Sequence, residues 1–265
     1  MLELPGKPMQ NQVCHEPSIR IRGLTKVFDG VKVLDALDLD IFKCETLVVI
    51  GRSGCGKSVL LKNITGLLKP DEGEIYLDND DITKLHRKNL FQMRKHFGML
   101  FQSSALFDSL SVGENVALPL RKHTDLTEEE IRETVIKRLS LVGLGDVYDK
   151  YPAELSGGMK KRAGLARAVV MNPTVVLYDE PTTGLDPIMA DVINELIRRL
   201  QHELDITSVV VTHDIKSAYK VGDRIAMLHG GKIIYQGTPD DVRRTDDPVV
   251  RQFIEGSAEG PIKAV

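Results

Sequence analysis

Cysteines and long apolar runs are scarce in this sequence, and each scarcity excludes a class of protein. The three cysteines, Cys14, Cys44 and Cys55, lack the paired spacing of metal ligands, so they predict no zinc site. Cys55 lies in a glycine-rich loop whose backbone a disulfide would distort, which indicates a reducing compartment. No run of about 18 apolar residues is available to cross a bilayer as a helix.

Signals for export and for nucleic-acid binding are also missing. Residues 1–17 contain three prolines, but neither the apolar core of a signal peptide nor the arginine- and serine-rich composition of a transit peptide. The net charge is −3 and no long basic block is present, so the sequence lacks the electrostatic character of a dedicated nucleic-acid-binding protein. We therefore expect an N-terminal extension over 1–17, no nucleic-acid partner, and action on any membrane from the cytoplasmic face through a partner protein.

The most informative stretch that is present is Gly51–Ser58, with the sequence GRSGCGKS, which follows the apolar run 47–50. A strand, a glycine-rich loop and a helix in this order bind phosphate, because glycines let successive backbone N–H groups point at phosphate oxygens beside the positive end of the helix dipole. Lys57 is expected to contact the β- and γ-phosphates, and Ser58 to bind Mg²⁺. Cys55, beside Lys57 at a helix N-terminus, is expected to have a lowered thiol pKa.

The segment before this loop predicts a layer of strands. Residues 19–22 alternate apolar and basic side chains, which suggests an edge strand, and Val33–Ile41 alternates again, with Val33 facing inward. Phe28 lies on a turn between these two segments. Its ring could stack on an adenine or pack in the core, and the pattern favours neither.

The middle of the chain predicts a helical lobe inserted in the α/β core. Residues 105–120 have scattered apolar side chains without a firm period, as in a surface joint. Residues 127–141 predict a helix, because Thr127 and Glu130 form a capping box and apolar residues recur every four positions after it.

A second phosphate-binding element is predicted at the start of the next helix. Ser156 is a candidate N-cap and is followed by Gly157 and Gly158, so this helix presents exposed N–H donors and the positive end of its dipole. An ordinary capped helix is the alternative when this segment is considered alone. A phosphate loop elsewhere in the same chain favours the phosphate clamp.

Two later strands end in groups suited to phosphate chemistry. The apolar strand 175–178 is followed by Asp179 and Glu180, and the strand 208–212 is followed by His213. Ligands of parallel α/β sheets gather at the carboxyl ends of strands, where these groups lie. Asp179 is expected to support Mg²⁺, Glu180 to accept a proton from the attacking water, and His213 to sense the γ-phosphate.

The order of these motifs resembles the ATP-binding subunits of ABC transporters across about residues 18–240. The resemblance implies an α/β fold, a P-loop NTPase core with an N-terminal antiparallel β layer and an inserted α-helical subdomain at about 85–170, followed by a C-terminal tail over 241–265. It also implies a homodimer that binds ATP and Mg²⁺.

The resemblance assigns roles residue by residue. The catalytic residues would be Glu180, His213 and Lys57, and the metal-binding residues Ser58, Gln102 and Asp179. Gln102 would also link the metal to a membrane partner, and Phe28 would stack on adenine. The nucleotide-binding residues would be Phe28, Gly51, Arg52, Ser53, Gly54, Cys55, Gly56, Lys57, Ser58, Val59, Gln102, Ser156, Gly157, Gly158 and Asp186.

Two details narrow the resemblance to the ATP-binding subunits of Mla-type transporters, which are paired with MCE-domain proteins. The signature segment, Leu155–Met159, ends in methionine where the wider family has glutamine, and the tail sequence 247–256 is similar to the tail of Mla-type subunits. The resemblance implies phospholipid trafficking between the two membranes of Gram-negative bacteria, from the cytoplasmic side of the inner membrane. The implied partners are a permease (MlaE-like), a periplasmic MCE protein reached through it (MlaD-like) and a small STAS-domain protein (MlaB-like).

The tail itself predicts a short amphipathic helix. Val249, Val250, Phe253 and Ile254 recur at helical spacing before Gly256 interrupts the pattern. We expect these side chains to be buried on the other ATPase subunit, or on the STAS-domain protein.

Two other functions remain as alternatives. A soluble ABC-type ATPase acting on ribosomes or DNA would resemble relatives that carry two cassettes or a long coiled coil, and this chain has neither. A small-molecule P-loop kinase would not need the clamp at Ser156–Gly158.

Overall fold

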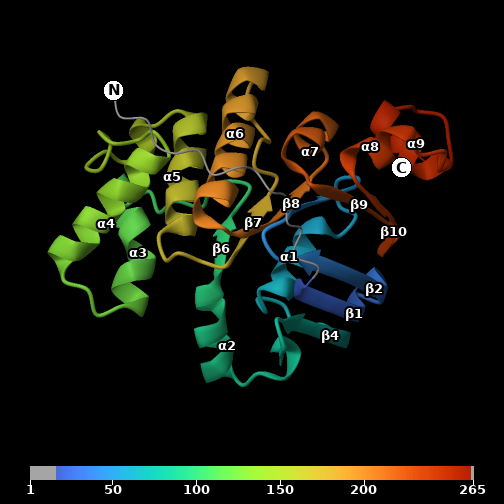
Figure 1. Cartoon of the computed structure of the whole chain (residues 1–265), viewed down its shortest axis with the longest axis horizontal. Coiled ribbons are helices and arrows are strands. Elements are labelled where there is room, and N and C mark those ends of the chain that lie inside the picture. The colour runs from blue at the N-terminus through green and yellow to red at the C-terminus, as the bar shows by residue number, and fades with distance from the viewer. Residues whose placement is uncertain (1–15, 264–265) are drawn as a thin grey trace.

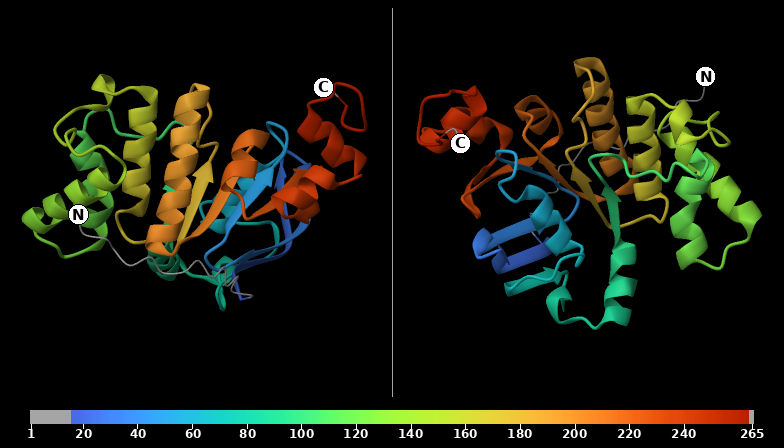
Figure 2. Two further views of the ribbon diagram at one scale, coloured as in Figure 1. Left: turned by 45° about the horizontal axis from the view of Figure 1, so that its top comes forward. Right: turned by 180° about the vertical axis from the view of Figure 1, so that it is seen from behind.

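The structure is a computed structural model that describes residues 16–263. Expectations that concern residues 1–15, including Cys14 and most of the N-terminal extension, lie outside the described residues. Figure 1 shows two sheets near the middle, with a group of helices at one end of the molecule and the C-terminal helices at the other. The two further views in Figure 2 agree with this arrangement.

The larger sheet has six strands in the order β10-β9-β3-β8-β7-β6. The strands are β3 (Thr46–Ile50), β6 (Phe97–Leu100), β7 (Val175–Asp179), β8 (Thr207–Thr212), β9 (Arg224–His229) and β10 (Lys232–Gly237). All are parallel except β10, which forms an antiparallel hairpin with β9. Every residue of β3, β7 and β8 is buried, as the continuous apolar runs predict for parallel strands covered on both faces.

The smaller sheet is antiparallel, with the order β2-β1-β4-β5. Its strands are β1 (Pro17–Phe28), β2 (Val31–Phe42), β4 (Glu72–Leu77) and β5 (Asp80–Asp81). The predicted edge strand at 19–22 is wrong, because β1 pairs with β2 on one side and with β4 on the other. Of the two basic side chains of this segment, Arg22 forms an ion pair with Asp40, and Arg20 donates to the backbone carbonyl of Asp78.

The alternation expected in β2 is interrupted by an irregularity. Ala36 has a φ of 48°, and the pairing register of β1 with β2 shifts in this region. As a result Leu34 is fully buried while Val33 is only partly buried. After the shift, every second residue from Leu37 to Ile41 faces the core, as predicted.

Helix α1 (Lys57–Ile64) joins the two sheets into one core. Its side chains Leu60, Leu61 and Ile64 belong to a cluster that also holds residues of β1 and β2 on one side and of β3 and β8 on the other. Arg94 donates to the carbonyl oxygens of Thr65 and Gly66 and so satisfies backbone acceptors at the end of this helix.

The remaining helices surround the larger sheet or stand at its end. They are α2 (Arg87–Met93), α3 (Val112–His123), α4 (Glu128–Leu141), α5 (Gly157–Val169), α6 (Pro187–Leu204), α7 (Ile215–Val221), α8 (Pro239–Arg244) and α9 (Pro248–Glu255), with 3-10 turns at 82–84, 94–96 and 152–154. Among residues 16–263, no helix is long and apolar enough to span a membrane.

The surface joint expected over residues 105–120 is wrong for its second half, which forms α3. Ser111 caps α3 in a reciprocal capping box with Glu114, and Pro119 is accommodated inside the helix. The range expected for the helical subdomain, 85–170, also contains β6, a strand of the larger sheet. The capping box predicted at Thr127 and Glu130 is confirmed.

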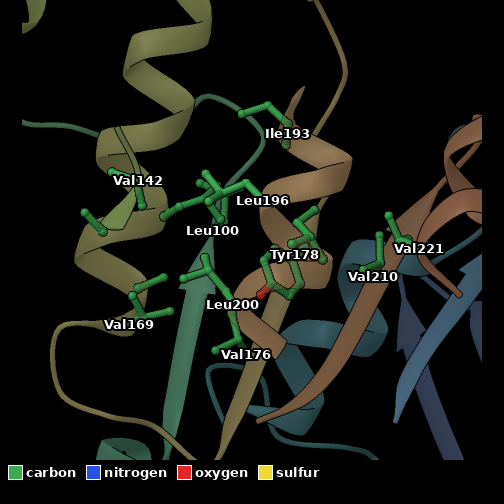
Figure 3. Packing of buried hydrophobic residues seen from close by; sticks show 14 of the residues in the cluster. Leu100, Val142, Val169, Val176, Tyr178, Ile193, Leu196, Leu200, Val210 and Val221 are labelled. Carbon is green, nitrogen blue, oxygen red and sulfur yellow. The ribbon is translucent and has the colours of Figure 1, made fainter. Parts of the chain in front are cut away.

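Helices α5 and α6 pack on the face of the larger sheet through one apolar cluster. Figure 3 shows Tyr178 of β7 close to the α6 residues Leu196 and Leu200, with Val176 of β7 and Leu100 of β6 nearby. Tyr178 is fully buried, so close packing around its side chain holds the end of β7, where Asp179 follows, in place.

The tail forms the predicted short helix, α9, which packs on the chain's own cassette. Val250 is buried, and Val249, Phe253 and Ile254 lie against the larger apolar cluster. Beyond α9 the chain folds back, so that the amide of Gln252 bonds both the N–H and the carbonyl of Ile262. The expected contact with a second subunit stays a prediction.

Candidate functional site

The loop Gly51–Ser58 leads from the carboxyl end of β3 into α1, as the sequence predicts. Gly56 has a φ of 106°, and a Cβ there would lie 3.0 Å from the carbonyl oxygen of Val33. A Cβ at Gly51 would lie 2.5 Å from the carbonyl oxygen of Leu228 in β9. Both positions therefore require glycine, the first for its backbone angle and for space, and the second for its close approach to a neighbouring strand.

Lys57 is the first residue of α1 and is buried, with 5% of its surface exposed. Its Nζ donates to the carbonyl oxygens of Gly51 at 2.8 Å and Arg52 at 3.1 Å, and lies 3.3 Å from Glu180 Oε1. The ammonium is therefore held inside the loop by oxygen acceptors. Phosphate oxygens could take the place of these acceptors.

Asp179 and Glu180 reach the same loop from the end of β7. The Ser58 hydroxyl donates to Asp179 Oδ1 at 2.8 Å, which links the loop to this strand. Glu180 has a φ of 49°, a backbone conformation that is uncommon for a residue other than glycine and is concentrated at functional sites.

The carboxylate of Glu180 is held by several donors. His213 Nδ1 lies 2.9 Å from Oε2, and the hydroxyl groups of Thr183 and Thr212 donate to the same oxygen at 3.1 and 3.3 Å. Sequence reasoning missed both threonines. The signal for Thr212 is its place as the last residue of β8, immediately before His213.

The two neighbouring carboxyl groups have pKa values shifted in opposite directions. Burial favours a raised pKa at Glu180, but the hydrogen bond from His213 and the charge of Lys57 outweigh it and leave the pKa below its usual value. Burial also dominates at Asp179, where the Ser58 hydrogen bond opposes it and the charge of Glu180 adds to it, so the pKa of Asp179 is raised. Glu180 is therefore a carboxylate at neutral pH, as a proton acceptor must be.

An open cleft brings together half of the predicted residues. Its lining includes Gly54, Lys57, Ser58, Gln102, Glu180 and His213, with Ser53, Gly56, Val59 and Val33 completing it. Apart from Val33 of β2, these residues follow the ends of β3, β6, β7 and β8, which lie next to one another in the larger sheet. The cleft can therefore hold a phosphate chain between an ammonium group, backbone N–H groups and a carboxylate.

The structure does not bring Ser156–Gly158, Asp186 or Phe28 into this cleft. Ser156 caps α5 by accepting a hydrogen bond from the Met159 N–H, as predicted, and Asp186 caps α6 in the same way. The two helix starts are neighbours, because Gly158 lies against Met189 of α6. Phe28 is exposed, with Lys26 Nζ above its ring at 5.5 Å from the ring centre.

The lowered pKa expected for Cys55 is wrong. The thiol lies against the cluster between the sheets, and this burial raises its pKa above the ordinary value, although the charge of Lys57 acts in the opposite direction. The helix N-terminus predicted an activated thiolate, but desolvation is the larger effect here.

We therefore expect Cys55 to react slowly with a maleimide, and more slowly still with saturating ATP, because the thiol is half-buried and protonated at neutral pH. In a Cys14→Ser variant, the labelling rate of Cys55 should be compared by peptide mass spectrometry with that of the exposed Cys44. Raising the pH should speed the reaction of Cys55, because the thiolate fraction rises as the pH approaches the raised pKa. Labelling of Cys55 as fast as Cys44, and unaffected by ATP, would contradict this expectation.

The sequence also matches known proteins over most of its length. The family described as "ABC transporter" matches residues 34–183. A probable ribonucleotide transport ATP-binding protein, mkl, from Mycobacterium leprae is 44% identical over 245 residues, which cover 92% of this chain and 71% of the relative. The intermembrane phospholipid transport system ATP-binding protein MlaF from Haemophilus influenzae is 42% identical over 245 residues, covering 92% of this chain and 93% of the relative.

Solved structures agree with these sequence matches. The cbiO1 protein of Clostridium perfringens, part of an ABC transporter complex, is 34% identical with a TM-score of 0.80, covering 90% of this chain and 94% of its own. A dimeric ATP-binding cassette bound to ADP and Pi after hydrolysis is 34% identical with a TM-score of 0.77, covering 83% of this chain and 98% of its own. The predicted fold class, a P-loop core with an antiparallel layer and helices, is confirmed.

Proposed function

Because the chain belongs to the ABC transporter family of ATP-binding proteins, we propose that it is the subunit that powers phospholipid transport between two membranes. Membership of the family gives it nucleotide binding and ATP hydrolysis. The observation that carries the phospholipid cargo is the 42% identity to MlaF from Haemophilus influenzae, which extends over 93% of that protein.

The cleft supports a division of roles in hydrolysis. Lys57 and the N–H groups at the start of α1 would bind the phosphates and stabilise the charge that develops in the transition state. Glu180 would orient the attacking water and accept its proton, and His213 would contact the γ-phosphate. Lys57 and His213 both contact Glu180 now, so the phosphates would compete with this carboxylate for the same two donors.

The donor set also fits Mg²⁺. Ser58, Asp179 and the side chain of Gln102 offer hydroxyl, carboxylate and amide oxygens, which are the hard ligands that Mg²⁺ prefers. The Ser58 hydroxyl and the Asp179 carboxylate are already adjacent at 2.8 Å. When bound there, Mg²⁺ would neutralise phosphate charge.

A homodimer would complete the site. Ser156–Gly158 lie outside the cleft of their own chain, so a phosphate clamp from these residues has to act on the nucleotide of a second copy. Dimeric solved relatives support this arrangement. The remaining partners of the proposal are an MlaE-like permease, an MlaD-like MCE protein reached through the permease, and an MlaB-like STAS-domain protein, with the ATPase attached to the cytoplasmic side of the inner membrane.

The cargo can be tested directly. The tagged chain should be purified with its complex from membranes and reconstituted in liposomes, and the bound subunits and lipids identified by mass spectrometry. We expect a permease, an MCE protein and phospholipid, together with ATPase activity that depends on the assembled complex. The mycobacterial relatives are named for ribonucleotide transport. Stimulation by ribonucleotides with no bound phospholipid would therefore overturn the proposal, as would recovery of the chain with ribosomes or DNA.

A further inference from the structure

A buried lysine, Lys161, lies beside the cleft and has no role in the assignments above. It belongs to the second turn of α5, and only 5% of its surface is exposed. It shares the buried side of the helix with Gly158, Leu165 and Ala168, so its burial follows from helical spacing. Sequence reasoning missed it because a run of two lysines and an arginine usually marks a solvated face.

The ammonium of Lys161 connects three elements of the site. Its Nζ donates to the backbone carbonyl of Gln102 at 2.5 Å and to that of Glu180 at 3.3 Å. Gln102 follows β6 and Glu180 follows β7, which are neighbouring strands. One side chain therefore ties the ends of both strands to α5, the helix that Ser156 caps.

A buried ammonium is costly unless its hydrogen bonds and charge are matched. Burial lowers the pKa of Lys161, while the nearby charges of Asp179 and Glu180 act to raise it. The two carbonyl acceptors and these two acids explain how a lysine is retained in the interior. A neutral side chain would fill the space but leave both carbonyls without this donor.

The bond to Glu180 helps to hold the backbone of this residue in an uncommon conformation. Glu180 has a φ of 49°, its N–H donates to Val211 at 2.9 Å, and its carbonyl accepts from Lys161. With both backbone groups held, the direction of the Glu180 side chain is determined by its neighbours on β8 and α5.

We propose that Lys161 is a positioning residue for ATP hydrolysis, which holds Glu180 and the loop 101–111 after β6, here called the Gln102 loop, in a fixed relation to the start of α5. When the start of α5 contacts the nucleotide bound to a second copy of the chain, any shift of α5 is then transmitted to Glu180 and Gln102 through the ammonium group of Lys161. The inference rests on the proposed roles of Glu180, Gln102 and Ser156–Gly158, and it does not depend on the cargo.

Lys161→Met tests the proposal, because methionine is an unbranched side chain only one atom shorter than lysine and removes its charge and donors. We expect kcat to fall by roughly 10- to 100-fold while KM and the Kd for ATP stay within about threefold, since misplacement of catalytic groups affects the transition state more than binding. Lys161→Arg, which keeps the charge and donors, should recover part of kcat. Lys160→Met is the matched control and should match the parent, because Lys160 is partly exposed and its side chain makes no hydrogen bond or ion pair within residues 16–263.

A second measurement follows the Gln102 loop itself. The chain contains no tryptophan, so Phe101→Trp places a single reporter beside Gln102. In this background, Lys161→Met should change the emission before nucleotide is added and reduce the change on adding ATP. If Lys161→Met does not fold, judged by circular dichroism and Tm, Lys161→Gln takes its place.

A variant with kcat within twofold of the parent, or with ATP binding weakened as much as kcat, would overturn the positioning role. Unchanged ATPase kinetics of Lys161→Met would reject the positioning role of Lys161. The absence of phospholipid from the purified complex would reject the phospholipid cargo, and the two results are independent of each other. A clear kcat effect with no phospholipid in the complex would reject the cargo alone.

Discussion

Glu180→Gln is expected to lower ATP turnover by roughly 10² to 10⁴ while leaving Mg-ATP binding intact. Glutamine has the same shape as glutamate and can still meet Thr183 and Thr212, but it cannot accept a proton from water. Lys57, His213 and these two threonines all contact Glu180, so the loss of its charge acts directly on the groups that surround the phosphates.

The measurement is steady-state turnover together with equilibrium binding of ATP and Mg²⁺. ATP can bind at least as tightly as in the parent, because Lys57 no longer has a carboxylate competing for its ammonium. Asp179→Asn is a useful comparison, since it keeps an oxygen acceptor for the Ser58 hydroxyl but removes the negative charge, and it should weaken the effect of Mg²⁺ on binding. Turnover of Glu180→Gln within twofold of the parent would remove Glu180 from the mechanism.

Mixed dimers should separate a shared active site from an independent one. If each site combines the loop of one chain with Ser156–Gly158 of the other, a dimer of one Lys57→Ala subunit and one Ser156→Arg subunit keeps one intact site. Each variant alone should lose activity by roughly 10²-fold or more, because it damages both sites. The mixed dimer should regain a large part of the activity of a single site.

The matched control places both substitutions in one chain and pairs that chain with a parent subunit. Each shared site then carries one lesion, so this dimer should be inactive, whereas independent sites would leave the parent subunit working. With shared sites the dimer of two single variants is the more active one, and with independent sites the dimer that contains a parent subunit is the more active one. Purification through two different tags removes the parent forms. Equal activity at the level of the Lys57→Ala control in both dimers would mean that one site cannot work alone.

The parts of the site that were predictable from sequence are those set by local spacing. The loop Gly51–Ser58 has its glycines at fixed intervals between a strand and a helix, and Asp179 and Glu180 follow an unbroken apolar strand. These patterns determine both the local structure and its place at the carboxyl edge of the sheet. The structure accordingly brings Lys57, Ser58, Glu180 and His213 into one cleft.

Other features depend on contacts that no local pattern records. The central position of β1 depends on β4, which pairs with it from about fifty residues away. The raised pKa of Cys55 depends on apolar side chains from the two sheets, and Lys161 depends on two carbonyls contributed by distant strand ends. Helix α3 could not be predicted for a different reason. Pro119 interrupts its helical pattern of apolar residues, and the capping box of Ser111 and Glu114 alone did not outweigh this signal.

The order of strands in the larger sheet has a consequence for synthesis of the protein on the ribosome. Strand β3 lies between β8 and β9, which are synthesised last among the parallel strands. Ser58 donates its hydrogen bond to Asp179, which is synthesised 121 residues later. A nascent chain that already contains the whole phosphate loop therefore has no pairing partner for β3 until residues 207–229 have emerged. Nucleotide cannot stabilise early intermediates, and fragments that end before β8 would expose the apolar edges of β3 and β7 to chaperones and proteases.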